Sequence, residues 1–353
     1  MRRKVIICVC CCNILLILLL SCSEPSKEVR AEKQTDLKTE TVFEKTEADQ
    51  NVVATTSATQ MEISSDSNTT TTVHTTKKTT VSHTITEAST TILRNLTSAP
   101  YEGLYNARTM ECICSKSSDV LISPASLTKI LTACVALKYV SPEKVFTVGT
   151  EQSFVSEGSS LCLIKSGHRL KLHDLLTGML LRSGNDAAYT VAVNVSREVS
   201  GNKNMNDSEA VSYFAKLMND YAYAIGARNS NFTNPDGWDD EEQYSSVYDL
   251  ALISANAIQI KEIRNIASSC SKYVVFESGE NVTWSNSNSL LQPGSKYYMP
   301  QAIGLKTGTT AKAGYCLIAV VSVKSEEYIA VVIGCKSNDE RYEAVQRLTG
   351  MIK

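Results

Sequence analysis

Histidine and net charge are both scarce in this chain of 353 residues, and each shortage excludes a class of function. Only four histidines occur, and only His168 and His173 lie beyond the polar N-terminal part. The chain has no Gly-x-Ser-x-Gly motif, and with so few histidines a Ser-His-Asp hydrolase is poorly supported. Two histidines are also too few for a His-rich metal site. We predict both to be solvated surface residues. The formal net charge of −2 gives no indication of nucleic-acid binding.

Cysteine is abundant, but it lacks the spacing of a disulfide framework or a zinc site. Five of the twelve cysteines fall in the first 22 residues, and the rest are scattered at positions 112, 114, 134, 162, 270, 316 and 335. This odd, unpatterned set argues against a disulfide scaffold. Cys112 and Cys114 could bind a metal or act in redox chemistry, but we favour two cysteines on one face of a strand. We expect neither a metal nor a cofactor.

Glycine is absent before Gly103, and the chain begins with the pattern of an export signal. Three basic residues at positions 2–4 precede an apolar run, which predicts a signal peptide over residues 1–22. Leu19-Leu20-Ser21-Cys22 resembles the lipobox of bacterial lipoproteins, so Cys22 is a candidate lipidation site. An uncleaved membrane anchor and ordinary cleavage stay open. Each anchor leaves the rest of the chain outside the cytoplasm.

Residues 23–98 are rich in Ser, Thr, Lys and Glu and cannot bury enough apolar surface to fold. We predict a disordered tether, with a glycosylated or receptor-binding stalk as the alternative. Residues 99–353 form the predicted folded domain, with strands at both ends and helices between them. This order implies an α+β fold, an antiparallel sheet flanked by helices. The predicted helices are 124–140, 172–181, 186–199, 208–225, one opening at a capping box on Ser246, and 339–351; the later strands are 272–277, 282–285, 302–309, 313–323 and 328–335, with a hairpin turn at 325–326.

A serine and a lysine one helical turn apart are the first candidates for chemistry. Ser123-Pro124 is typical of a helix start, which places Ser126 in the first turn and Lys129 on the same face. The residues that follow are apolar almost all round, which indicates burial. A dry environment lowers a lysine pKa, so the amine can serve as base for a serine nucleophile. The same spacing recurs, without a long apolar helix, at Ser141/Lys144, Ser200/Lys203 and Ser269/Lys272.

Two further motifs follow in the chain. Ser183-Gly184-Asn185 lies between two predicted helices, and Lys306-Thr307-Gly308 lies within a predicted strand. Each has a plain structural interpretation by itself: Ser183 could cap the next helix, Asn185 could occupy a left-handed turn, and Lys306 could be an ordinary edge-strand lysine. The three motifs in this order favour one shared active site.

From about residue 100 to 353 the sequence resembles the serine D-alanyl-D-alanine carboxypeptidases, the low-molecular-mass penicillin-binding proteins. The resemblance implies a β-lactamase/transpeptidase-like fold, with the active site between the sheet and an all-helical lobe. Many members carry a second β-rich domain and a C-terminal membrane helix. Here the sequence ends soon after the predicted sheet, so we expect the N-terminus to provide the anchor. The resemblance extends beyond the motifs through Gly158-Ser159-Ser160, Asp174-Leu175-Leu176, Asn234-Pro235-Asp236-Gly237, Tyr244-Ser245-Ser246 and Asn286-Ser287-Asn288.

The resemblance implies catalytic roles for four residues. Ser126 attacks the carbonyl between the last two D-alanines of a peptidoglycan stem peptide, and Lys129 takes its proton. Ser183 bridges the two motif lysines and passes a proton to the leaving D-alanine. Asn185 binds a substrate amide and orients Lys129. Water then hydrolyses the acyl-enzyme, and β-lactams mimic the substrate and stall at the acyl stage.

The resemblance also implies a substrate-binding strand. Lys306 and Thr307 hold the terminal carboxylate, which needs a cation and a hydroxyl. Gly308 leaves room for the substrate along the strand edge. The N–H groups of Ser126 and Thr309 form the oxyanion hole. Some members have histidine where this chain has Thr309, which leaves the substrate preference open.

The predicted function is therefore an extracytoplasmic carboxypeptidase at the bacterial membrane or cell wall. A D,D-endopeptidase acting on cross-links would use the same machinery. A class A β-lactamase is disfavoured, because the chain lacks a Glu-x-x-Leu-Asn run and has Gly184 where that family has aspartate. A β-lactam sensor or a catalytically silent wall-binding module is disfavoured by the three intact motifs.

Overall fold

The computed structural model of the chain describes residues 97–352. The predicted signal peptide, the candidate lipidation site Cys22 and all but the end of the predicted tether lie outside these residues. None of the helices between residues 97 and 352 is long and apolar enough to cross a membrane.

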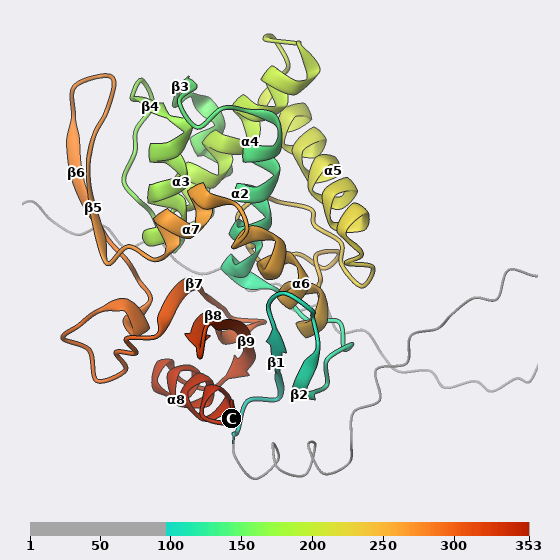
Figure 1. The fold of residues 1–353 in the computed structure, drawn as a ribbon. Coiled ribbons are helices and arrows are strands. Elements are labelled where there is room, and N and C mark those ends of the chain that lie inside the picture. The colour runs from blue at the N-terminus through green and yellow to red at the C-terminus, as the bar shows by residue number, and fades with distance from the viewer. Residues whose placement is uncertain (1–96, 353) are drawn as a thin grey trace, which may run out of the picture. The chain divides into compact units, whose positions relative to one another are not determined.

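A five-stranded antiparallel sheet lies below a group of helices (Figure 1). The apolar runs of β8 and β9 form its centre and are buried on both faces, because a separate cluster of side chains covers each face. β7 forms one edge of the sheet, and that edge faces the site described below. In spatial order the strands are β2 (Cys112–Lys116), β1 (Tyr101–Asn106), β9 (Glu326–Cys335), β8 (Gly314–Val323) and β7 (Ala302–Thr310).

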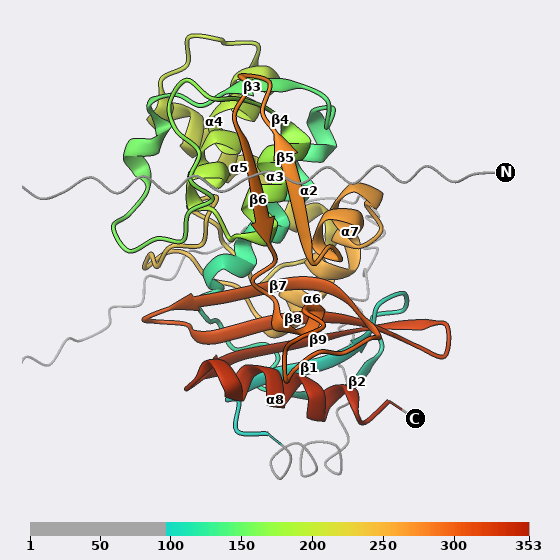
Figure 2. The ribbon, with the colours of Figure 1, turned by 90° about the vertical axis from the view of Figure 1, so that its left-hand side faces the viewer.

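The two faces of the sheet are covered by different parts of the chain. Figure 2 shows α8 (Asn338–Thr349) along one face and the other helices on the opposite side. α8 buries Tyr342, Val345 and Leu348 against the sheet. The helices of the opposite side are α2 (Thr128–Tyr139), α3 (Leu172–Leu181), α4 (Asn185–Ser200), α5 (Asp207–Ile225), α6 (Val247–Ala257) and α7 (Lys261–Ala267).

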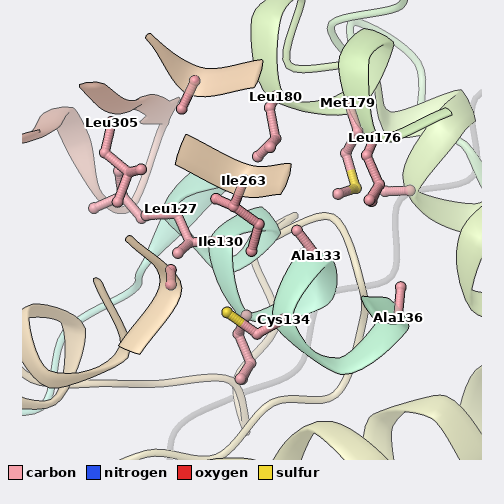
Figure 3. Close-up of a cluster of buried hydrophobic side chains, with 14 of the residues drawn as sticks. Leu127, Ile130, Ala133, Cys134, Ala136, Leu176, Met179, Leu180, Ile263 and Leu305 are labelled. Carbon is pink, nitrogen blue, oxygen red and sulfur yellow. The ribbon is translucent and has the colours of Figure 1, made fainter. Parts of the chain in front are cut away.

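The centre of this helical lobe is α2, whose residues from Thr128 to Ala136 are all buried. Figure 3 shows Ile130 of this helix and the preceding Leu127 among Leu180, Ile263 and Leu305, which come from α3, α7 and β7. Burying each such side chain stabilises the fold by roughly 1.5–3 kcal/mol. The predicted apolar helix is confirmed, and its packing fixes its N-terminus at the junction of lobe and sheet.

Two small antiparallel pairs complete the lobe. β3 (Val145–Thr147) pairs with β4 (Arg169–Lys171), and β5 (Ser271–Val275) pairs with β6 (Asn281–Ser285). Trp284 of β6 is buried, and its Nε1 donates a hydrogen bond to Cys162 O over 2.9 Å. The β5–β6 hairpin therefore holds the loop that follows the short 3-10 helix η2 (Thr150–Phe154).

The start of the apolar helix differs from the prediction. The first turn is a 3-10 turn, η1 (Ala125–Leu127), and the α-helix begins only at Thr128. Ser123 caps neither element; its Oγ donates to Asp239 Oδ1 over 2.7 Å. The prediction was wrong because a carboxylate far along the chain competes for the hydroxyl, and Ala125 takes a left-handed φ of 48°.

The prediction that Cys112 and Cys114 share one face of a strand is also wrong. The pairing of β1 with β2 contains a bulge, because Leu104 lies opposite Cys114 while the next residue, Tyr105, lies opposite Cys112. A bulge adds one residue and so turns the next side chain to the other face. Cys112 packs against the helical lobe, and Cys114 lies on the α8 side. The β8–β9 turn also lies one residue earlier than predicted, at 324–325.

Serine caps begin two of the helices. Ser246 Oγ accepts from Asp249 N over 3.1 Å, which confirms the predicted serine cap of α6. The Asp249 carboxylate does not complete a capping box; it accepts from Asn229 N over 2.7 Å. Ser337 Oγ accepts from Glu340 N over 3.1 Å at the start of α8. Each cap satisfies a backbone N–H that has no partner within its helix.

We expect Ser337→Ala to lower the free energy of unfolding by about 1 kcal/mol, the usual cost of losing a cap. Ser337 is exposed, so the change leaves no cavity. Urea unfolding of the full chain, followed by circular dichroism, measures the difference. Ser337→Asp restores a capping oxygen and should keep nearly the original stability. Equal destabilisation by alanine and aspartate would show that the cap does not support α8.

Candidate active site

Ser126, which is half-buried, and Lys129 form a hydroxyl–amine pair at the start of α2. Lys129 Nζ donates to Ser126 Oγ over 3.0 Å and to Asp236 O over 2.5 Å. The side chain of Lys129 is fully buried. Burial lowers the pKa of Lys129 to about 8, although the carboxylates of Asp236 and Asp186 act in the opposite direction. The arrangement can therefore supply a neutral amine next to a hydroxyl at moderately alkaline pH.

The segment that contains Asp236 supports this pair from the lobe. Thr132 Oγ1 donates to Pro235 O over 2.6 Å, so α2 is bonded to the segment at a second point. Gly237 has a φ of +83°, and a Cβ built there would lie 1.8 Å from Ala125 O. Only glycine fits this close approach to η1. The sequence signal was the Asn234-Pro235-Asp236-Gly237 run, to which no role was assigned.

Ser183 lies in the connection from α3 to α4, and Asn185 is the first residue of α4. Ser183 is buried and is itself the left-handed residue, with a φ of 60°. The N-cap of α4 is Gly184, without a side-chain cap, so both plain interpretations, Ser183 as cap and Asn185 in a left-handed turn, are wrong. Both interpretations fail for the same reason, because α4 begins at Asn185 and the left-handed turn lies before it, at Ser183.

The side chain of Asn185 links three parts of the lobe. Its Nδ2 donates to Ser159 Oγ over 2.9 Å, and its backbone N donates to Ser160 O over 2.8 Å. Burial raises the pKa of Asp236, and Lys129 and the Asn185 amide lower it in part, so these groups are neighbours. Asn185 Oδ1 is buried without a hydrogen-bond partner among residues 97–352. Its capacity as an acceptor is therefore unused within the described part of the chain.

Lys306 lies on β7 and is not an ordinary edge-strand lysine. It is 1% exposed, and its Nζ donates to Thr307 O over 2.8 Å. Burial lowers the pKa of Lys306 well below its usual range, and repulsion from Lys129 and Arg341 lowers it further. Because the two charges repel each other, the amines of Lys306 and Lys129 lie close enough for one to affect the pKa of the other. The interpretation as a solvated edge lysine is therefore wrong.

The edge of β7 lies against the turn that carries Ser126. A Cβ built on Gly308 would lie 3.1 Å from Ala125 Cβ and 3.3 Å from Ser126 N, so a side chain there would crowd η1. Thr307 Oγ1 lies 3.0 Å from Ser287 Oγ. Thr309 is exposed beside them. Residues of the sheet edge and of the lobe thus meet at Ser126.

Arg341 belongs to the site's support and was missed by the sequence analysis. This α8 residue is 8% exposed, and its Nη1 donates to Gly308 O over 3.1 Å and to Thr309 Oγ1 over 3.2 Å. It therefore holds β7 from the opposite face of the sheet. The available signal was its position: Arg341 shares one helical face with the apolar Val345 and Leu348.

The remaining candidates lie elsewhere. Lys144 and Lys203 both pair with Glu198, and Ser269 Oγ donates to Asn265 O, so these Ser-x-x-Lys pairs form no buried site. His173 contacts Glu262, and the ring of His168 packs on Phe276, so both are partly covered and not simply solvated. Among residues 97–352 no group of three His, Cys, Asp or Glu side chains could hold a metal ion.

Comparison with known proteins agrees with this geometry. The family model described as D-alanyl-D-alanine carboxypeptidase matches residues 104–337. Two similar curated proteins are the D-alanyl-D-alanine carboxypeptidases DacF of Bacillus subtilis and DacD of Salmonella typhimurium. The chain is 30% identical to DacF, and the match covers 66% of this chain and 57% of DacF. It is 32% identical to DacD, and that match covers 64% of this chain and 55% of DacD. The chain thus spans little more than half the length of these relatives.

Solved structures show the same fold. The Streptomyces K15 DD-transpeptidase aligns with a TM-score of 0.66 and 26% identity, over 72% of this chain and 97% of that one. The carboxypeptidase DacD from Francisella tularensis aligns with a TM-score of 0.61, also at 26% identity, over 72% of this chain and 71% of that one. The predicted α+β fold, with an antiparallel sheet and helices, is confirmed. Because the family model spans more than half of the sequence and the fold agrees, the chain belongs to the D-alanyl-D-alanine carboxypeptidase family.

Proposed function

We propose that the chain is a serine D-alanyl-D-alanine carboxypeptidase that removes the terminal D-alanine from peptidoglycan stem peptides. One observation carries the proposal: Lys129 Nζ lies 3.0 Å from Ser126 Oγ, and the amine is fully buried. A serine needs an adjacent base to act as a nucleophile, and a dry lysine can be that base. The names of the similar curated proteins support the same substrate class.

The first step is acylation of Ser126. Its Oγ attacks the carbonyl carbon of the penultimate D-alanine while its proton moves to neutral Lys129. The tetrahedral intermediate then collapses, the C–N bond breaks, and the nitrogen of the leaving D-alanine takes up the proton through Ser183. The acyl chain stays on Ser126 as an ester, and water hydrolyses it. A β-lactam follows the same first step, but its ring nitrogen stays attached and the ester persists.

Binding groups surround the reacting carbonyl. Lys306 and Thr307 hold the terminal carboxylate, and its negative charge favours the protonated form of the buried amine. The backbone N–H groups of Ser126 and Thr309 receive the oxyanion; the close approach of Gly308 to Ser126 N supports this pairing. The unpartnered Oδ1 of Asn185 accepts a substrate amide N–H.

The proposal includes the location of the enzyme. Residues 1–22 export the chain, Cys22 is the lipidation site, and residues 23–98 are a tether that places the catalytic domain outside the bacterial cytoplasmic membrane. The support is the basic and apolar N-terminal pattern together with the lipobox-like Leu19-Leu20-Ser21-Cys22. The partners are then stem peptides, β-lactams and the membrane.

Ser126→Ala tests the nucleophile. We expect D-alanine release from diacetyl-Lys-D-Ala-D-Ala to fall by about 10⁴-fold or more, because no ester can form. Covalent labelling by a fluorescent penicillin should disappear. Ser141→Ala is the matched control, since it removes an exposed serine from another Ser-x-x-Lys pair. Labelling that survives Ser126→Ala would overturn the assignment. Cross-link loss from muropeptides without D-alanine release would indicate the endopeptidase, and rapid penicillin turnover without it a β-lactamase.

The pH dependence of acylation tests the base. The pKa of Lys129 is lowered to about 8, and only the neutral amine accepts a proton. The acylation rate should therefore rise about tenfold per pH unit below pH ~8 and level off above it. Stopped-flow acylation by a β-lactam between about pH 6 and 10 measures the profile. A flat profile would exclude Lys129 as the base.

A further inference from the structure

The chain contains two tryptophans in contrasting environments. Trp284 is 2% exposed beneath the β5–β6 hairpin, whereas Trp238 leaves 38% of its surface exposed. Single exposed apolar residues are common on protein surfaces, so exposure by itself assigns no function. The position of Trp238 in the chain is the informative feature.

Trp238 lies between residues that contact both halves of the site. Asp236 accepts the hydrogen bond from Lys129, and Gly237 lies against the turn that carries Ser126. On its other side, Asp239 Oδ1 accepts from Thr310 Oγ1 at the end of β7 over 2.7 Å. Trp238 is therefore fixed at the rim where the lobe meets the end of β7.

The backbone of Trp238 is held on both sides. Its N donates to Asp236 Oδ1 over 3.2 Å. Its carbonyl oxygen accepts from Asn234 Nδ2 over 3.1 Å and from Gln243 Nε2 over 3.2 Å. Because this segment is already ordered, contact with a ligand would cost little additional backbone entropy.

The proposed binding mode gives the direction of the substrate. The terminal carboxylate lies at Lys306 and Thr307, and the scissile carbonyl lies at Thr309. Strand residues advance about 3.3 Å each, so the part of the peptide before the scissile bond extends toward Thr310. Asp239, the neighbour of Trp238, is bonded to Thr310. The acyl side of the substrate thus passes the segment that carries Trp238.

We propose that Trp238 is a specificity-determining residue whose indole packs against the substituent on the acyl side of the scissile bond. In a stem peptide this is the side chain of the residue before D-Ala-D-Ala, and in a penicillin it is the acyl group on the ring amine. An indole suits this role because it buries apolar area and its face attracts an ammonium at the end of an aliphatic chain. The inference rests on the proposed function, since it requires acylation of Ser126.

Two β-lactams separate the contact from the chemistry. Penicillin G carries a phenylacetyl group on its ring amine. 6-Aminopenicillanic acid has the same reactive ring and carboxylate but lacks this acyl group. In the full chain, Trp238→Ala should slow acylation by penicillin G about tenfold or more, the range of one good apolar contact. Acylation by 6-aminopenicillanic acid should change less than about twofold. Trp238→Phe should recover most of the difference, and Tyr223→Ala, an exposed aromatic on α5, should change neither rate.

Fluorescence tests the same contact in the unaltered chain. Acrylamide should quench the exposed Trp238 and leave the buried Trp284 protected. Acylation by penicillin G should reduce this quenching, and acylation by 6-aminopenicillanic acid should not. Equal slowing of both β-lactams by Trp238→Ala, or quenching that penicillin G leaves unchanged, would overturn the inference while Ser126 chemistry stands. Failure of both β-lactams to acylate the unaltered chain would instead reject the proposed function, and the inference with it.

Discussion

The amine of Lys129 is buried, and both hydrogen-bond acceptors that it has between residues 97 and 352 are uncharged: the Ser126 hydroxyl and the Asp236 carbonyl. A charged ammonium taken out of water without a bonded counter-ion costs several kcal/mol, so the site favours the neutral form. Neutral lysine is the form that can accept a proton. The stability cost of burying this side chain and its chemical use therefore have one physical origin, and the rest of the fold keeps water away from it.

Two close backbone contacts hold η1 against the lobe and the sheet. At Gly237 the lobe segment meets the carbonyl of Ala125, and at Gly308 the edge strand meets the amide of Ser126. A side chain at either position would push η1 away from its neighbours and admit water. Arg341 holds β7 in place from the α8 side. The position of Ser126 therefore depends on packing from both the helical lobe and the sheet.

Local patterns predicted the parts of the site that depend on neighbours in sequence. The apolar run after Ser126 predicted a buried helix, and the Ser-x-x-Lys spacing placed Lys129 beside it. The errors involve distant partners. Ser123 was predicted to cap the helix but bonds to Asp239. Taken alone, Lys306 would have been assigned to an ordinary edge strand, and only its order with the other motifs placed it in the site; its burial depends on the rest of the fold. Arg341 could have been suspected from its place on an apolar helix face, but its contact with Gly308 could not.

The two buried lysines are proposed to serve as base and as anion-binding cation, and their charges are coupled. Each amine is desolvated, and the charge of one disfavours the charge of the other, so the pair releases protons in steps and not independently. In the proposed mechanism a substrate carboxylate at Lys306 favours the proton on that amine. Lys129 then experiences the opposed fields of the carboxylate and of the Lys306 cation together. Recognition of the chain end and protonation of Lys129 are therefore electrostatically linked in this mechanism.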